Sequence, residues 1–173
     1  DFAHRHLAAL ARAEEPASRI AAARALGVAG RAGHSQELRR LLKDPSPEVR
    51  VAAGRAAGES GAAEMLPHLV DLLADPRTTR TATEALVSMK ESSLDLLADT
   101  LSNVAVSPLL RARIPRVLSD IGDSVCMQVL LDRMAVSEPS VRAEIAAAAG
   151  RRLRRSGRLF EDTDLVQQLC ARE

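Results

Sequence analysis

The 173-residue sequence contains almost no aromatic side chains. It has two phenylalanines, Phe2 and Phe160, and no tyrosine or tryptophan. Residues that favour β-strands are scarce in general, whereas the abundant alanine and leucine favour helix. We therefore expect an all-α protein. Its helices should be thin and should approach one another closely, because alanine adds little bulk.

The sequence also has little from which a catalytic or metal site could be built. Its two cysteines, Cys126 and Cys170, are far apart, and its four histidines form no cluster with zinc-ligand spacing. Phosphate-binding glycine loops and nucleophile-elbow motifs are missing as well. We therefore predict a protein that is not an enzyme and that uses no metal and no cofactor.

A strong charge of one sign and long apolar runs are also lacking. The net charge is +1, so the chain has no global field that would attract nucleic acid. No apolar run is long enough to span a bilayer, and no signal-peptide pattern opens the chain. We expect a cytoplasmic protein that binds no nucleic acid. Because it starts with Asp1 and not with Met, we also expect a piece of a longer chain.

An internal repeat of about 31 residues runs through the sequence. Five prolines and five arginines keep this period: Pro16, Pro45, Pro76, Pro108 and Pro139, then Arg19, Arg50, Arg80, Arg111 and Arg142. An acid or a serine precedes each proline, which is typical of a helix N-terminus. Each proline is therefore predicted to start a helix. Glycines at 27, 58, 122 and 150 are predicted to end these helices, and Pro115 is predicted to kink the fourth one.

A second amphipathic segment precedes each of these helices, so every copy is a helix–turn–helix unit. One such pair cannot bury its apolar face alone, whereas stacked pairs can. We therefore predict one domain over residues 1–173, built as a right-handed α-solenoid. Its five repeats are predicted at about residues 2–30, 31–60, 61–90, 91–122 and 123–155, with a C-terminal capping helix in residues 160–173.

Two of the copies, DPSPEVRVAAGRAAG at 44–58 and EPSVRAEIAAAAG at 138–150, resemble the HEAT repeat and the related PBS-lyase-like repeat. In that family an acid and an arginine form a ladder between neighbouring repeats. The resemblance assigns this role to Asp44, Asp75 and Glu138, and to Arg19, Arg50, Arg80, Arg111 and Arg142. Ser107 stands where the fourth repeat should have its acid, so the sequence departs from the ladder there.

A narrower likeness concerns residues 108–134, PLLRARIPRVLSDIGDSVCMQVLLDRM. This stretch is similar to the soluble HEAT segment of bacterial nucleotide-translocase-like membrane proteins. The likeness implies a regulatory or docking module that does not itself cross the membrane. Such a module would be attached to a larger membrane protein at its cytosolic face.

The HEAT resemblance implies a non-catalytic scaffold that binds a protein or peptide along its concave surface. Arg24, Arg55 and Arg116 each lie five residues after a repeat arginine, opposite the apolar face, and are candidates for binding an acidic partner. The alternative is that they only solvate exposed helices. Two enzymatic alternatives are a phycobilin-lyase-like subunit and a HEAT-like DNA glycosylase. The glycosylases rely on aromatic side chains, which these repeats lack.

Overall fold

The computed structural model describes residues 2–29, 35–134 and 136–156, and these contain helices and turns but no strand. The all-α fold predicted from the sequence is thus confirmed. The chain forms two compact units, residues 1–96 and 97–173, with the boundary inside one helix. The segment predicted to form a capping helix, residues 160–173, lies outside the described residues.

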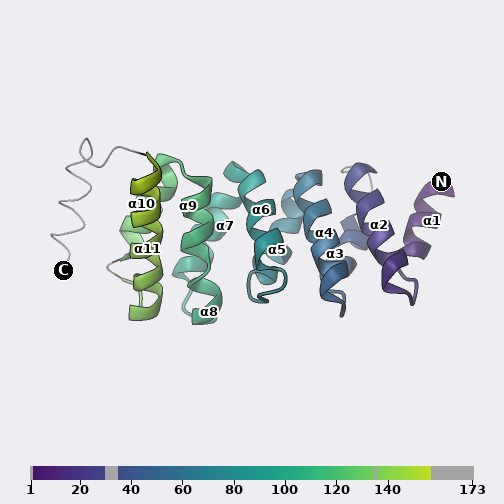
Figure 1. Ribbon diagram of the computed structural model, residues 1–173, viewed down its shortest axis with the longest axis horizontal. Coiled ribbons are helices and arrows are strands. Elements are labelled where there is room, and N and C mark those ends of the chain that lie inside the picture. Colours follow the sequence, from purple (N-terminus) through teal and green to yellow (C-terminus); the bar gives the residue numbers. More distant parts are fainter. Residues whose placement is uncertain (1, 30–34, 135, 157–173) are drawn as a thin grey trace. The chain divides into compact units, whose positions relative to one another are not determined.

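The first unit is built from helix pairs that pack side by side, as in a HEAT-like solenoid. Its elements are α1 (Phe2–Leu10), α2 (Pro16–Ala29), α3 (Ser35–Leu42), α4 (Pro47–Ser60), the 3-10 turn η1 (Ala63–Met65), α5 (Leu66–Leu72), α6 (Thr79–Ser88) and the start of α7 (Lys90–Ser102). Figure 1 shows the second helices of the pairs, α2, α4 and α6, next to one another, and α4 contacts both neighbours. The first helices α3 and α5 also touch.

Small residues let the second helices come into backbone contact. A Cβ added to Gly27 would lie 3.0 Å from the Cα of Ala56, and one added to Gly58 would lie 2.9 Å from the Cα of Ala85. The prediction that Gly27 and Gly58 end their helices is therefore wrong, because both lie inside a helix where the next helix crosses. Helix α4 instead ends at Gly61, whose φ of 60° is left-handed.

Two helices begin later than their prolines predict. Helix α4 begins at Pro47 because the Ser46 side chain, not that of Asp44, accepts the bond from the Val49 N–H. Helix α6 begins at Thr79, three residues after Pro76. The predicted starts at Pro16, Pro108 and Pro139 are confirmed.

The second unit contains the end of α7 together with α8 (Pro108–Arg111), α9 (Ile114–Ile121), α10 (Ser124–Met134) and α11 (Pro139–Ser156). Helices α9 and α11 pack against each other, and α10 contacts both. The kink predicted at Pro115 is a break: α8 ends at Arg111, and α9 restarts with Pro115 in its first turn, where no backbone donor is needed. Gly122 ends α9 with a φ of 75°, as predicted, but Gly150 lies inside α11.

The backbone contact at Gly58 leads to a stability prediction. Gly58→Ala should lower the free energy of unfolding by about 1–3 kcal/mol, because the added methyl group meets the backbone of Ala85 and forces α4 and α6 apart. Chemical denaturation of the variant and of the parent protein measures this difference.

Gly150→Ala is the matched control. Gly150 is also inside a helix, but an added Cβ would meet only the flexible end of Arg154, 3.5 Å away. Its replacement should raise stability by about 0.5–1 kcal/mol through the better helix propensity of alanine. Equal effects of the two changes would contradict the role assigned to Gly58.

Candidate functional site

The repeat arginines lie at the turns that join the two helices of a pair. Arg19 donates through Nε to Asp44 Oδ2 at 2.7 Å and through Nη2 to Asp44 Oδ1 at 2.9 Å. Its Nη1 also donates to the carbonyl oxygens of Ala13 and Glu14, at 2.9 and 2.6 Å. One guanidinium therefore closes the turn of its own repeat and holds the acid of the next repeat.

Arg50 makes the corresponding contacts in the next repeat. Its Nη2 donates to Asp75 Oδ2 at 2.6 Å, and its Nη1 donates to the carbonyl oxygens of Asp44 and Pro45, at 2.7 and 3.1 Å. The acid lies 25 residues after the arginine in both cases. The structure thus brings together two of the arginine–acid pairs that the resemblance assigned, both within the first unit.

The second unit contains a third pair. Arg111, whose side chain is 6% exposed, donates through Nη2 to Glu138 Oε1 at 2.8 Å and through Nε to the Val106 carbonyl at 3.1 Å. Arg142 donates to the carbonyl of Ser137 at 3.0 Å, so it closes its own turn in the same way.

Arg80 is placed differently from the other ladder arginines. Its side chain is 91% exposed and donates to Glu84 on its own helix at 2.9 Å. The turn before α6 is closed by threonine instead, since the buried Thr78 hydroxyl donates to the Leu72 carbonyl at 2.7 Å. The ladder role predicted for Arg80 is therefore replaced by a local pair, and the sequence signal for this was the run of threonines before it.

Two of the ladder acids, Asp44 and Asp75, are held in their ionised form. Arg77, which bonds to Asp75 through its side chain and its backbone N–H, lowers the pKa of Asp75 from 3.8 to about 2, and Arg50 adds to this effect. For Asp44, burial opposes ionisation, but the hydrogen bond from Arg19 and that from the Ser46 N–H outweigh it, so the pKa of Asp44 is also lowered.

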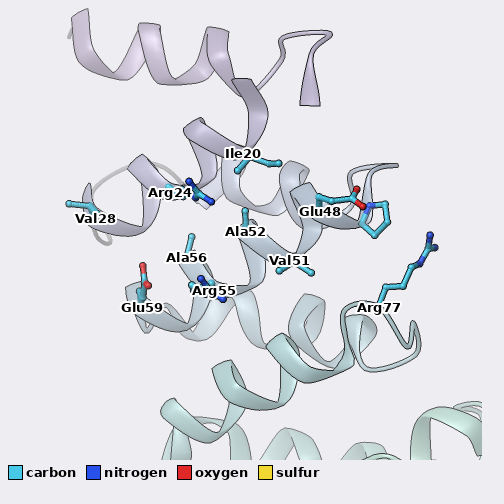
Figure 2. A pocket seen from close by; sticks show the side chains of 11 residues that line it. Ile20, Arg24, Val28, Glu48, Val51, Ala52, Arg55, Ala56, Glu59 and Arg77 are labelled. Atoms are coloured by element: carbon cyan, nitrogen blue, oxygen red, sulfur yellow. The ribbon is translucent and has the colours of Figure 1, made fainter. Parts of the chain in front are cut away.

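A groove of about 600 Å³ lies over the exposed faces of α2 and α4 and contains two of the predicted binding residues, Arg24 and Arg55 (Figure 2). Its floor is small and apolar and its rim is charged. It is lined by Ile20, Arg24, Val28, Pro47, Glu48, Val51, Ala52, Arg55, Ala56, Glu59 and Arg77. A smaller hollow between α4 and α6 shares Arg55 and Glu59 with it.

The two arginines in the middle of the groove are exposed and form no ion pair with another described residue. Sequence reasoning did not identify the apolar walls beside them. The available signal was the helical repeat, because Ile20 and Val28 lie four residues before and after Arg24, and Val51 lies four residues before Arg55.

Arg116, the third predicted binding residue, belongs to the second unit. It lies on α9, is 71% exposed, and has its Nε 3.8 Å from Asp120 Oδ2. Arg155 donates to the same carboxylate at 2.9 Å. Asp120 therefore offsets the charge of Arg116, in contrast to Arg24 and Arg55.

The described part of the chain gives little support for metal binding or for a reactive thiol. No group of three His, Cys, Asp or Glu residues could hold a metal ion there. Burial raises the pKa of the Cys126 thiol to about 11, so this thiol is unreactive at neutral pH. Across the described helices, none is long and apolar enough to cross a bilayer.

The helix pairs of the first unit, the contacts of Arg19 and Arg50 with their acids, and the groove lie in a part of the chain that matches a known family. Residues 5–90 match the family model for HEAT repeats. The match ends where the third predicted repeat ends, so it covers about half of the chain and supports a HEAT-repeat protein. HEAT repeats are generally protein-interaction scaffolds. No curated protein sequence matches the chain.

Removal of a ladder arginine should destabilise the protein. Arg50→Ala should lower the free energy of unfolding by about 1–3 kcal/mol, because two turn carbonyls and a carboxylate lose their donor. Arg80→Ala is the matched control and should change it by less than about 0.5 kcal/mol, since its pair is exposed. Urea denaturation of both variants measures the effects, and similar losses would refute the distinction.

Stability should also depend on pH through Asp75. Because its pKa is lowered in the folded protein, its contribution is fully present above 3.8 and is lost as the pH falls from 3.8 through about 2. The difference in melting temperature between the parent protein and Asp75→Asn should therefore shrink over that range. Arg77→Ala should raise the pKa of Asp75 in a carboxyl NMR titration, and an unchanged pKa would contradict the assignment.

Proposed function

We propose that the chain is a protein-interaction module whose partner lies along the exposed faces of α2 and α4. The observation that carries this proposal is the groove, which combines an apolar floor with two arginines that form no ion pair with a described residue. Exposed apolar surface next to unpaired charge is typical of a recognition surface. The match of these helices to HEAT repeats supports the same function.

The composition of the groove favours recognition over catalysis. Its eleven lining residues include no histidine, cysteine, serine or aromatic residue. Histidine is the most frequent general acid–base residue, and serine and cysteine are frequent nucleophiles, so the two carboxylates of the groove, Glu48 and Glu59, have none of these partners there. Nucleotide binding of the glycosylase kind depends on aromatic residues. The groove therefore gives no support to the two enzymatic alternatives.

The proposal extends to the context of the module only through residues 108–134. Their likeness to the soluble segment of nucleotide-translocase-like membrane proteins favours a module that docks other proteins at the cytosolic side of a larger membrane protein. Arg116 lies within this stretch, but its neighbour Asp120 makes it a weaker anion site than the groove.

Site-specific photo-crosslinking tests the proposed surface. A photoreactive residue at Val28, which is 88% exposed at one end of the groove, is introduced into the protein in the organism that produces it. The control carries the same residue at exposed Gln36 on α3. We expect a crosslinked protein at Val28 that is missing at Gln36 and that Arg24→Glu/Arg55→Glu abolishes.

Two crosslinking results would contradict the proposal. If Val28 gives no crosslinked product, or the same products as Gln36, the partner does not occupy the groove. Circular dichroism melting of the double variant checks that it folds.

A further inference from the structure

The side chains that line the groove occupy three successive positions along its length, which we call levels. Figure 2 shows Ile20 and Val51 toward one end, Arg24 and Arg55 in the middle, and Val28 toward the other end. The members of each wall are four residues apart on their helix, so adjacent levels are about 6 Å apart at 1.5 Å per residue. The groove thus presents an apolar level, then a cationic level, and then a level at which Val28 on α2 faces the acidic Glu59 on α4.

The middle level is suited to a carboxylate. Arg24 and Arg55 come from neighbouring helices and line the same groove (Figure 2). None of the ion pairs among the described residues includes either of them. A carboxylate placed between them would form charge-assisted hydrogen bonds to both, which are among the strongest polar contacts in proteins.

The floor of the groove limits the thickness of the occupant. Helices α2 and α4 are in backbone contact at Gly27 and Ala56, so nothing can pass between them. A bound helix, with a diameter of about 10–12 Å including side chains, would rest on the rims and leave Ala52 uncovered. An extended peptide is thin enough to reach the floor and both walls.

The spacing of an extended peptide also fits the three levels. Alternate side chains of an extended chain point the same way and are about 6.6–6.8 Å apart. This distance is close to the step of about 6 Å between levels of the groove. An acidic side chain at the middle level would therefore place aliphatic side chains, two residues before and after it, against Ile20 and Val51 on one side and against Val28 on the other.

We propose that the groove between α2 and α4 binds an extended segment of a partner protein with an aliphatic residue, an acidic residue and a second aliphatic residue at alternate positions. The acidic side chain lies between Arg24 and Arg55. One aliphatic side chain covers Ile20 and Val51, and the other covers Val28. This inference rests on the proposed function and names the chemistry of the partner.

Selection of peptides tests the inference directly, because it needs no purified partner protein. A phage-displayed library of random twelve-residue peptides is selected on the whole chain, and in parallel on Arg24→Glu/Arg55→Glu. We expect peptides from the parent protein to share one Asp or Glu with an aliphatic residue two positions to each side. The double variant should select Lys or Arg at the central position instead.

Affinity measurements on a selected peptide provide the quantitative test. Fluorescence anisotropy should show binding that is weakened at least about tenfold by the double variant, and by glutamine in place of the central acid. The variant Arg12→Glu/Arg40→Glu is the matched control, since it makes the same charge change at exposed arginines outside the groove. It should bind the peptide as the parent protein does.

Three results would overturn the inference: no enriched peptides, enriched peptides without the central acid, or aliphatic residues four positions from the acid, as a bound helix requires. Inorganic phosphate that displaces the peptide at equal concentration would also overturn it, since the site would then recognise any anion. If Val28 still crosslinks a partner in any of these cases, the proposed function stands and only the peptide chemistry is wrong.

Discussion

Backbone contact between neighbouring second helices is the constraint on which the first unit depends. It requires a residue without a side chain at Gly27 and Gly58 and a methyl group opposite each, at Ala56 and Ala85. Interiors are packed closely enough that one added carbon must move a whole helix. The same contact forms the shallow, apolar floor of the groove, so helix packing and the shape of the candidate site have a common origin.

The repeat arginines complement this contact at the other end of the helices. A turn between two helices exposes carbonyl groups that need donors. Arg19 and Arg50 supply donors to two carbonyls each and to the acid of the following repeat. The conformation of each of these turns thereby depends on the presence of the next repeat. Such contacts between neighbours make the folding of a stack of small repeats cooperative.

The fold could be predicted because two residue types keep one period and an apolar helical face follows each of them. The details that failed depend on tertiary contacts. A glycine that ends a helix and one that touches a neighbour look alike in sequence, so Gly27 and Gly58 were assigned the wrong role while Gly122 was assigned correctly. Helix α4 starts later than predicted because Ser46, and not Asp44, is its N-cap residue. The Asp44 carboxylate instead accepts a hydrogen bond from Arg19.

The candidate site was predictable in part for the same reason. Helical periodicity placed Arg24 and Arg55 on the exposed face, but it could not show which exposed arginines find a carboxylate nearby. Asp120 does this for Arg116, and Glu84 does it for Arg80. All three acids, Glu59 included, lie four residues after their arginine, yet Arg55 and Glu59 form no ion pair, so side-chain rotamers decide which of these charges are paired.

The constant distance of 25 residues between ladder arginine and acid in the first unit also bears on how such a chain can change length. Insertion or loss of one whole period among the first three repeats would leave the guanidinium groups of Arg19 and Arg50 the same distance from a carboxylate, and Gly27 and Gly58 opposite a small residue. The contacts between these repeats are thus interchangeable. Gene duplication can lengthen or shorten the array without any change in those contacts.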